Sequence, residues 1–566
     1  MDSAKVETQN ATEDINRDAE TKPPVAPSNG STNKNPKPRL KKALLKQFIT
    51  LSEAHDAEED MRAELQYALK RTKFYTYFEQ RLDQIRQLVA FHCGLNPDQV
   101  QVPEIFENNA LVWLHGTFNM CIPLRIKNPG PSLPSKLAFR VPLPYRVGED
   151  AYPGNSEEKL RSETATYIWI EKNCPDIPIP KLRGFGMPNG LSFCDPSFVP
   201  LWDRAKFYIR RFVNLLLKRQ SDMSNFVLQK RNVVLEHGYM LIDWIEYDDV
   251  QMLSNTFQLP HTDLQTENLY RSMSKIMISL AKVPQPRIGS WTINNDGRIS
   301  LTNRPMFCHL NILENWYIPT DIPRNMTYTS ADSFYLDLLA GHDNRLQHQA
   351  NAAFNDDDAR GQAADILLMR ALLHKFTDRR LRDGPFVMQL TDMHCSNILV
   401  DKDWNIKHVI DLEWACSLPL ETLLPPFWLT EEAIDTLTGD KYEKFKTQYE
   451  RFVEVFEEEE MRVNAPLQLN GTALLRAAPM KTSLNEARFF YLWALQSPKG
   501  LFNVSRQHLH SMFDKVSRGT LIDAISPFWT PGMACFVKSK LDKYNQYLQD
   551  VFDIFNSEKS GKAYYV

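Results

Sequence analysis

The chain lacks several features that mark large classes of protein. It has eight cysteines among 566 residues, but no C-x-x-C pair and no spacing typical of a zinc site. Because scattered thiols are typical of a reducing compartment, we expect free cysteines and a cytoplasmic protein. No run approaches the roughly 20 apolar residues of a membrane-spanning helix. The polar, acidic start does not resemble a secretory signal.

An excess of charge of one sign is also missing. The 66 basic and 70 acidic residues leave a net charge of -4, and 43% of the residues are hydrophobic. These values are ordinary for a globular protein with a sizeable core, so we expect neither nucleic acid nor a membrane as a partner. The Walker A pattern, G-x-x-x-x-G-K-[ST], is absent, which excludes a P-loop as the means of holding a nucleotide.

The beginning of the chain divides into two segments. Residues 1–42 are polar and almost free of large apolar side chains, which predicts a disordered tail. The basic run that ends this tail, KNPKPRLKK (34–42), is either a nuclear address or a solvated tail. Residues 43–104 have a helical period and predict a pair of helices with a core-facing stripe. That stripe comprises Leu65, Leu69, Phe74, Phe78, Leu82, Ile85 and Val89.

Short β-type runs follow in residues 105–247. They predict strands at ALVWLH (110–115), MCIPLRI (120–126), KLAFRVPL (136–143) and YMLIDWIEY (239–247). Residues 156–173 between them have a helical pattern, with Ser156 as a candidate N-cap.

Helical patterns dominate residues 248–566. They cover 262–283, 325–383 and 430–556, and a hairpin on Asn295-Asp296-Gly297 is expected within 288–305. The predicted fold is therefore α+β and two-lobed, with a small β-rich N-lobe and a larger, mostly helical C-lobe.

The stretch LTDMHCSNILVD (390–401) concentrates polar residues directly before an apolar run. The runs ILVD (398–401) and IKHVI (406–410) flank a four-residue loop and predict a hairpin. If Asp401 pairs with Ile406, Asn397 lies opposite Ile410 and next to Asp411, while Asp392 stands in the loop just before. One carboxamide and two carboxylates then converge at the same end of the hairpin.

Such a trio suits a hydrated divalent cation and phosphate. Mg²⁺ prefers oxygen ligands, and proteins usually offer it one or two carboxylates while phosphates and water complete the shell. Phosphoryl transfer also needs a carboxylate that orients the attacking hydroxyl and accepts its proton. A loop aspartate together with an Asn–Asp pair supplies that set.

The pattern D-x-x-x-x-N before an apolar strand, with I-D-x-E-W fourteen residues after the Asn, resembles the aminoglycoside phosphotransferase and choline kinase-like family. The likeness is strongest to the branch abundant in filamentous fungi. That family has a protein-kinase-like fold and uses ATP and Mg²⁺. The resemblance implies that Asp392 is the catalytic residue and that Asn397 and Asp411 are metal ligands.

Further segments extend the resemblance toward the nucleotide. HGTFN (115–119) resembles the phosphate-covering turn, and LAFRVPLP (137–144) resembles the strand with the phosphate-pairing cation. RSETATYIWIEKN (161–173) resembles the helix whose Glu pairs with that cation, and LIDWIEY (241–247) resembles the nucleotide hinge. By this resemblance, the cofactor-binding residues are Gly116, Thr117, Arg140, Glu163, Ile242 and Trp244.

Two departures from the family pattern leave alternatives open. Leu390 stands where the family has His, and Arg140 stands where it has Lys. These departures favour a pseudokinase, meaning a nucleotide-binding or scaffolding protein without transfer activity. A third alternative is a protein-assembly role for the tail and the helices at 43–93. The intact aspartates favour a phosphotransferase that acts on a hydroxyl of a small molecule. The aromatic set Trp414, Phe427 and Trp428 either lines a substrate pocket or packs in the core.

Overall fold

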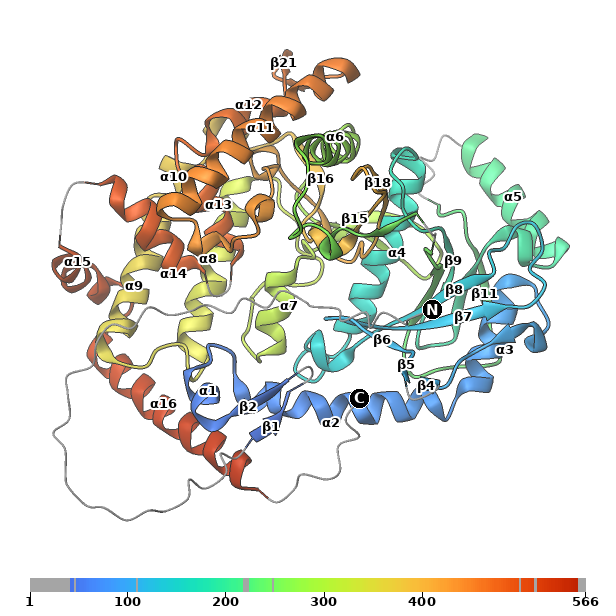
Figure 1. Ribbon diagram of the computed structural model, residues 1–566, viewed down its shortest axis with the longest axis horizontal. Helices are drawn as coiled ribbons and strands as arrows, with labels where there is room; N and C mark the ends of the chain where they lie inside the picture. Colours follow the sequence, from blue (N-terminus) through green and yellow to red (C-terminus); the bar gives the residue numbers. More distant parts are fainter. Residues whose placement is uncertain are drawn as a thin grey trace.

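The computed structural model describes residues 41–44, 47–107, 110–216, 223–246, 249–497, 500–513 and 517–557. Helices and antiparallel sheets are both present (Figure 1), as the sequence predicted. The expected disordered tail lies outside the described residues as far as residue 40. Its last two positions belong to a strand, β1 (Lys41–Ala43), which pairs with β2 (Phe48–Thr50).

The helices at 43–93 form as predicted, as α1 (Leu51–Asp56), α2 (Met61–Glu79) and α3 (Leu82–Cys93). Strands β1 and β2, which precede them, were not predicted. The apolar stripe faces the core except at Leu69, which is 59% exposed. Because α2 buries the face that carries Tyr67 and Phe74, a residue two positions after Tyr67 points the other way.

A large antiparallel sheet follows, with the strand order β11-β10-β9-β12-β8-β7-β3 and with β6 paired to β7. The predicted strand 110–115 is wrong as one element, because its two ends fall in the separate short strands β5 and β6. The strands in this part of the chain, inside and outside the large sheet, are β3 (Val100–Gln101), β4 (Phe106–Glu107), β5 (Ala110–Leu111), β6 (Leu114–His115), β7 (Asn119–Ile126), β8 (Lys136–Pro142), β9 (Leu182–Gly186), β10 (Leu191–Cys194), β11 (Val227–Lys230) and β12 (Tyr239–Asp243). Strands β4 and β5 pair only with each other.

Helix α4 (Asn155–Asn173) packs between this sheet and the hairpin of β14 (Ser290–Ile293) and β15 (Ile299–Asn303) (Figure 1). The helix was predicted, but Ser156 is not its N-cap. Gly154 takes that place with φ +98°, a left-handed conformation that suits glycine. The Glu149 carboxylate accepts hydrogen bonds from the amides of Gly154 and Ser156 at 2.7 Å each, so a side chain outside the helix caps it.

The rest of the described chain is mainly helical, as expected for residues 248–566, but its helix at Leu201–Leu216 was not predicted. Its helices are α5 (Leu201–Leu216), α6 (Asp263–Leu280), α7 (Cys308–Asn315), α8 (Ala331–His348), α9 (Asp356–Ala371), α10 (Leu373–Phe376), α11 (Gly439–Val463), α12 (Ala477–Ser483), α13 (Arg488–Gln496), α14 (Leu501–Val504), α15 (Arg518–Ile525) and α16 (Met533–Asn556). Helix α16 returns to pack against α1 and α2 (Figure 1). The predicted hairpin on Gly297 forms from β14 and β15.

Short antiparallel pairings are set among these helices. Strand β16 (Phe386–Leu390) pairs with β19 (Ala415–Pro419), and β17 (Ile398–Val400) pairs with both β18 (Ile406–Val409) and β13 (Gln251–Met252). The hairpin of β20 (Leu467–Leu469) and β21 (Thr472–Leu474) was not predicted.

Within the described ranges, no helix combines the length and the apolar character needed to cross a bilayer. All eight cysteines are free thiols, as the sequence predicted.

We predict that the unfolding free energy depends on pH through His92. This imidazole is fully buried between α3 and the large sheet, with Nε2 2.8 Å from Tyr239 Oη, and burial lowers its pKa to about 3. Between about pH 6.5 and pH 3, His92 binds a proton in the unfolded chain but stays neutral in the folded chain. Stability from this group is therefore present above that window and falls by about 1.4 kcal/mol per pH unit as the pH drops through it. Denaturant unfolding of the wild type and of His92→Gln at several pH values gives the unfolding free energy of each protein as a function of pH. If both free energies change with pH by the same amount, the prediction is wrong.

Candidate active site

Asp392 lies in the loop that joins β16 to β17. The Thr391 amide and hydroxyl both donate to the Trp414 carbonyl at 2.9 Å, which fixes the start of the loop. Asn397 Nδ2 donates to the Asp392 carbonyl at 2.9 Å and lies 3.4 Å from Asp392 Oδ2. The side chain of Asp392 is 30% exposed, so the loop holds a carboxylate that solvent still reaches.

The surroundings of Asp392 make its carboxylate more basic than usual. Burial raises the pKa of Asp392 well above its ordinary value, and the carboxylates of Glu413 and Asp411 raise it further. When it is ionised, an aspartate with a raised pKa takes up a proton more readily than an ordinary one.

The hairpin of β17 and β18 brings Asn397 beside the residue that follows it on the partner strand. The predicted register holds at this end, where the Ile410 amide donates to the Asn397 carbonyl at 3.0 Å. Near the turn, a register shift places Val400, not Asp401, opposite Ile406, so the predicted pairing is wrong there. A bulge therefore absorbs the difference before it reaches the end that carries Asn397.

Asp411 follows the hairpin with φ +60°, a left-handed conformation that is uncommon for a residue with a side chain. Its side chain is 33% exposed, and one carboxylate oxygen, Oδ1, pairs with Arg140. Within the described residues, Asp411 Oδ2 and Asn397 Oδ1 accept no hydrogen bond. These two oxygens are hard donors of the kind that Mg²⁺ prefers, so the donor set fits that cation.

Arg140 on β8 belongs to a buried charge network. Its Nη2 lies 3.0 Å from Glu413 Oε2, and its Nε lies 3.5 Å from Glu163 Oε1 on α4. Lys159, one turn earlier on α4, lies 2.6 Å from Glu413 Oε2 and 3.4 Å from Glu163 Oε2. Together with Asp411, these side chains connect the large sheet, α4 and the chain segment after β18.

The network carries an excess of negative charge. Two cations, Arg140 and Lys159, face the three carboxylates of Glu163, Glu413 and Asp411, which leaves one net negative charge. Burial alone would raise the pKa of Glu413, but Lys159 and Arg140 hold it below its ordinary value. For Glu163, burial prevails over the two cations and raises the pKa. An uncompensated carboxylate at this place is suited to a cation.

The turn that contains Gly116 and Thr117 joins β6 to β7 at the edge of this network. The Gly116 amide donates to the Asn119 carbonyl at 2.9 Å, and Arg146 Nε donates to the Thr117 carbonyl at 3.2 Å. Phe118, the next residue of the turn, packs edge-on against Trp414, with ring centroids 4.9 Å apart. The turn is therefore in contact with the residue that also anchors the Asp392 loop.

The two predicted hinge residues occupy different environments. Ile242 on β12 is buried in an apolar cluster with Ala138, Val409 and Leu412, which connects the large sheet to the β18 segment. Trp244 follows the end of β12 and packs half-buried against the same cluster. The last residue of the predicted hinge, at 247, lies outside the described residues.

Sequence reasoning did not assign Glu413, Lys159 and Asn119 to the site. Lys159 Nζ donates to Asn119 Oδ1 at 2.8 Å, and Asn119 Nδ2 donates to Glu413 Oε2. Two signals were present in the sequence. Lys159 stands four residues before Glu163 on one helix face, and Glu413 stands two residues after Asp411.

The aromatic set is mainly structural. Trp414 is 1% exposed, Phe427 is partly buried, and Trp428 donates from Nε1 to the Met393 carbonyl at 3.1 Å. Trp414 and Trp428 thus support the Asp392 loop from behind, which favours packing over the pocket-lining alternative for these two residues.

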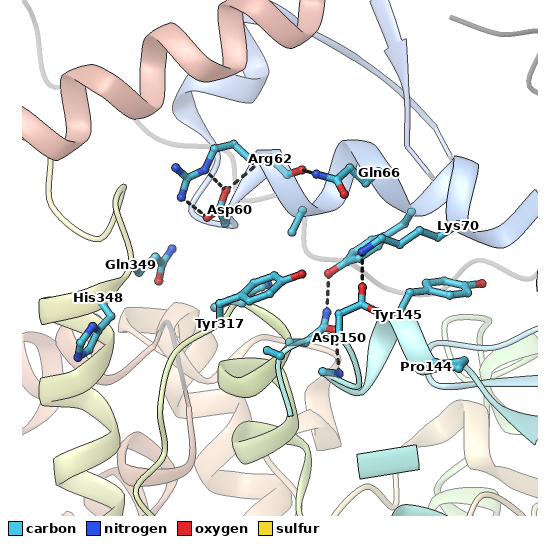
Figure 2. Close-up of a pocket in the computed structure, with 16 residues that line it drawn as sticks. Asp60, Arg62, Gln66, Lys70, Pro144, Tyr145, Asp150, Tyr317, His348 and Gln349 are labelled. Carbon is cyan, nitrogen blue, oxygen red and sulfur yellow. Dashed lines mark hydrogen bonds and ion pairs between the residues drawn. The ribbon is translucent and has the colours of Figure 1, made fainter. Parts of the chain in front are cut away.

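A cavity of about 310 Å³ lies elsewhere, between α2, the turn after β8 and the ends of α7 and α8 (Figure 2). None of the predicted site residues lines it. Its cations are matched by anions, with Lys70 Nζ 2.7 Å from Asp150 Oδ2 and Arg62 NH2 2.7 Å from Asp60 Oδ2. We assign the chemistry to the surroundings of Asp392, because the predicted site residues lie there and not in this cavity.

No protein-family model matches the chain, and no curated protein does. Among solved structures, it is similar to the apoenzyme of macrolide 2'-phosphotransferase MphH from Brachybacterium faecium. The TM-score is 0.30 and the identity 11%, over 76% of this chain and 98% of that chain. It is also similar to a macrolide 2'-phosphotransferase type I, with a TM-score of 0.27 and 11% identity, over 76% of this chain and 91% of that chain. These TM-scores are too low to assign a family, so the predicted family membership stays a prediction.

We predict that Lys159→Met destabilises the fold strongly. The change leaves two buried carboxylates, Glu163 and Glu413, with Arg140 as their remaining cationic partner, and the unfolding free energy should fall by about 3–5 kcal/mol. Adding Glu413→Gln in the same chain should recover part of that loss, as a denaturant-based double-mutant cycle would show. Lys275→Met, at an exposed position of α6, is the control. A loss for Lys159→Met no larger than the control's would contradict the network.

Proposed function

We propose that this chain is an ATP- and Mg²⁺-dependent phosphotransferase with a kinase-like fold, which transfers the γ-phosphate to a hydroxyl of a small molecule. The observation that supports it most is the convergence of Asp392, Asn397 and Asp411 at one end of a hairpin, beside Arg140. In this proposal, the large sheet and α4 form the smaller lobe, and residues 248–566 form the larger one.

Each side chain has a role that its surroundings support. Arg140 is a permanent cation held by carboxylates on two sides, which suits it to orient phosphate oxygens. Asn397 Oδ1 and Asp411 Oδ2 would hold Mg²⁺, which neutralises developing phosphate charge when bound. Asp392, with its raised pKa and partial exposure, accepts the proton of the acceptor hydroxyl.

The nucleotide base has a candidate neighbour in the apolar cluster around Ile242. Ala138 lies opposite Ile242 on β8, and Val409 and Leu412 approach from the segment that carries Asp411. An adenine ring with its phosphates toward Arg140 would thus meet apolar side chains on one side and the metal-binding residues on the other. Gly116 and Thr117 would cover the phosphates from the turn after β6.

A pseudokinase is the second candidate, because Arg140 pairs directly with Asp411. This contact occupies one oxygen of a proposed metal ligand with a guanidinium. Leu390 at the end of β16 also replaces the family's His and pairs with Ala415 in the sheet instead. The two candidates share nucleotide binding and differ in turnover, so the next two predictions separate them.

The first prediction concerns binding. Purified protein should show a thermal shift with ATP and Mg²⁺ together, and Asp411→Ala should abolish it, because that change removes a metal ligand together with the net negative charge of the network. Asp403→Ala, on the exposed turn of the same hairpin, is the matched control and should keep the shift. If the wild type shows no shift with ATP and Mg²⁺, the phosphotransferase and a nucleotide-binding pseudokinase both fail.

The second prediction concerns turnover. Asp392→Asn should keep nucleotide binding but lower kcat by about 10²–10⁴-fold, because the carboxamide cannot accept the proton. A screen of metabolite pools for ATP-dependent phosphorylation would supply the acceptor for this assay. Wild-type turnover in the variant would show that Asp392 is not the base. Binding without any turnover in the wild type would favour the pseudokinase.

A further inference from the structure

Helix α5 is amphipathic, but its apolar face is turned toward solvent, whereas a core helix turns that face inward. At about 100° per residue, its apolar side chains fall on an arc of roughly 140°. That arc faces solvent, and its residues are 44–77% exposed: Leu201, Trp202, Tyr208, Ile209, Phe212, Val213 and Leu216. Scattered exposed apolar residues are normal, but seven on one helix face form a contiguous patch.

The opposite face attaches α5 to the rest of the protein. Phe207 is 7% exposed and packs with Cys194 on β10 and Val227 on β11. Asn214 on the same face is also 7% exposed and contacts Met223 Sδ at 3.1 Å. Figure 1 shows α5 at the rim of the molecule, beside the edge strand β11. The orientation of the apolar arc toward solvent is therefore fixed by packing.

Basic residues flank the arc on both margins. Lys206 and Arg210 lie along one side, and Arg204 and Arg211 lie along the other, whereas the one acidic residue of α5, Asp203, lies on the attached face. Lys206 Nζ also lies over the ring of Trp202, 5.4 Å from its centroid. Long basic side chains beside an apolar stripe keep their charges at the level of lipid headgroups while the stripe enters the acyl region.

We propose that α5 docks this protein on an anionic lipid surface, lying in the plane of the interface. The charge pattern favours this occupant over a second copy of the chain, because pairing two such helices would bring margins of the same sign together. The helix is 16 residues long, which suits an interfacial helix and not a spanning one. The proposal is independent of the proposed function, and it departs from the expectation, based on net charge, of no membrane partner.

Vesicle sedimentation of the full chain tests the proposal. The wild type should bind phosphatidylcholine vesicles that contain about 30% phosphatidylserine, and bind pure phosphatidylcholine much more weakly. Ile209→Asp with Phe212→Asp should lower the partition coefficient by about a hundredfold, because two apolar anchors are lost. Leu264→Asp with Phe528→Asp, at exposed apolar positions off the helix, is the matched control and should leave binding unchanged.

A second variant isolates the electrostatic part. Lys206→Glu with Arg210→Glu should remove most of the preference for phosphatidylserine and leave the melting temperature unchanged, because both side chains are exposed. Three results would overturn the proposal: no binding of the wild type to either vesicle, equal binding by the helix variant and its control, or a dimer in light scattering that the helix variant dissociates without any vesicle binding.

Discussion

A buried cluster of charges determines how the parts of the site meet. Arg140 comes from the sheet, Lys159 and Glu163 from α4, and Glu413 from the segment after β18. None of these side chains is stable in a dry environment without the others, because an unpaired buried charge costs several kcal/mol. Their mutual pairing therefore fixes the position of α4 against the sheet and of both against the loop that follows the hairpin.

The remaining geometry depends on that positioning. The Glu413 backbone stands two residues from Asp411, so a shift of Glu413 would move the proposed metal ligand. Trp414, the next residue, accepts from Thr391 through its carbonyl and packs against Phe118 through its ring. One short segment thus connects the Asp392 loop, the turn at Gly116 and the charge network, which explains why acidic and aromatic side chains stand next to each other in it.

The sequence was informative where short-range geometry decides the result. Two strands joined by a short loop leave few registers, so the approach of Asn397 to the segment that carries Asp411 was predictable. The role of Lys159 was not, since a helical lysine is usually solvated and its burial depends on Glu413, more than 250 residues away. The cap of α4 was missed for a related reason, because Glu149 reaches it from outside the helix.

The central claim is that Asp392, Asn397 and Asp411 form one site for a nucleotide-bound cation. A crystal structure with a non-hydrolysable ATP analogue and Mg²⁺ tests it most directly. The account predicts a cation in contact with Asn397 Oδ1 and Asp411, with the terminal phosphate between Arg140 and Asp392. A nucleotide bound in another part of the molecule, or a cation held by other side chains, would contradict it.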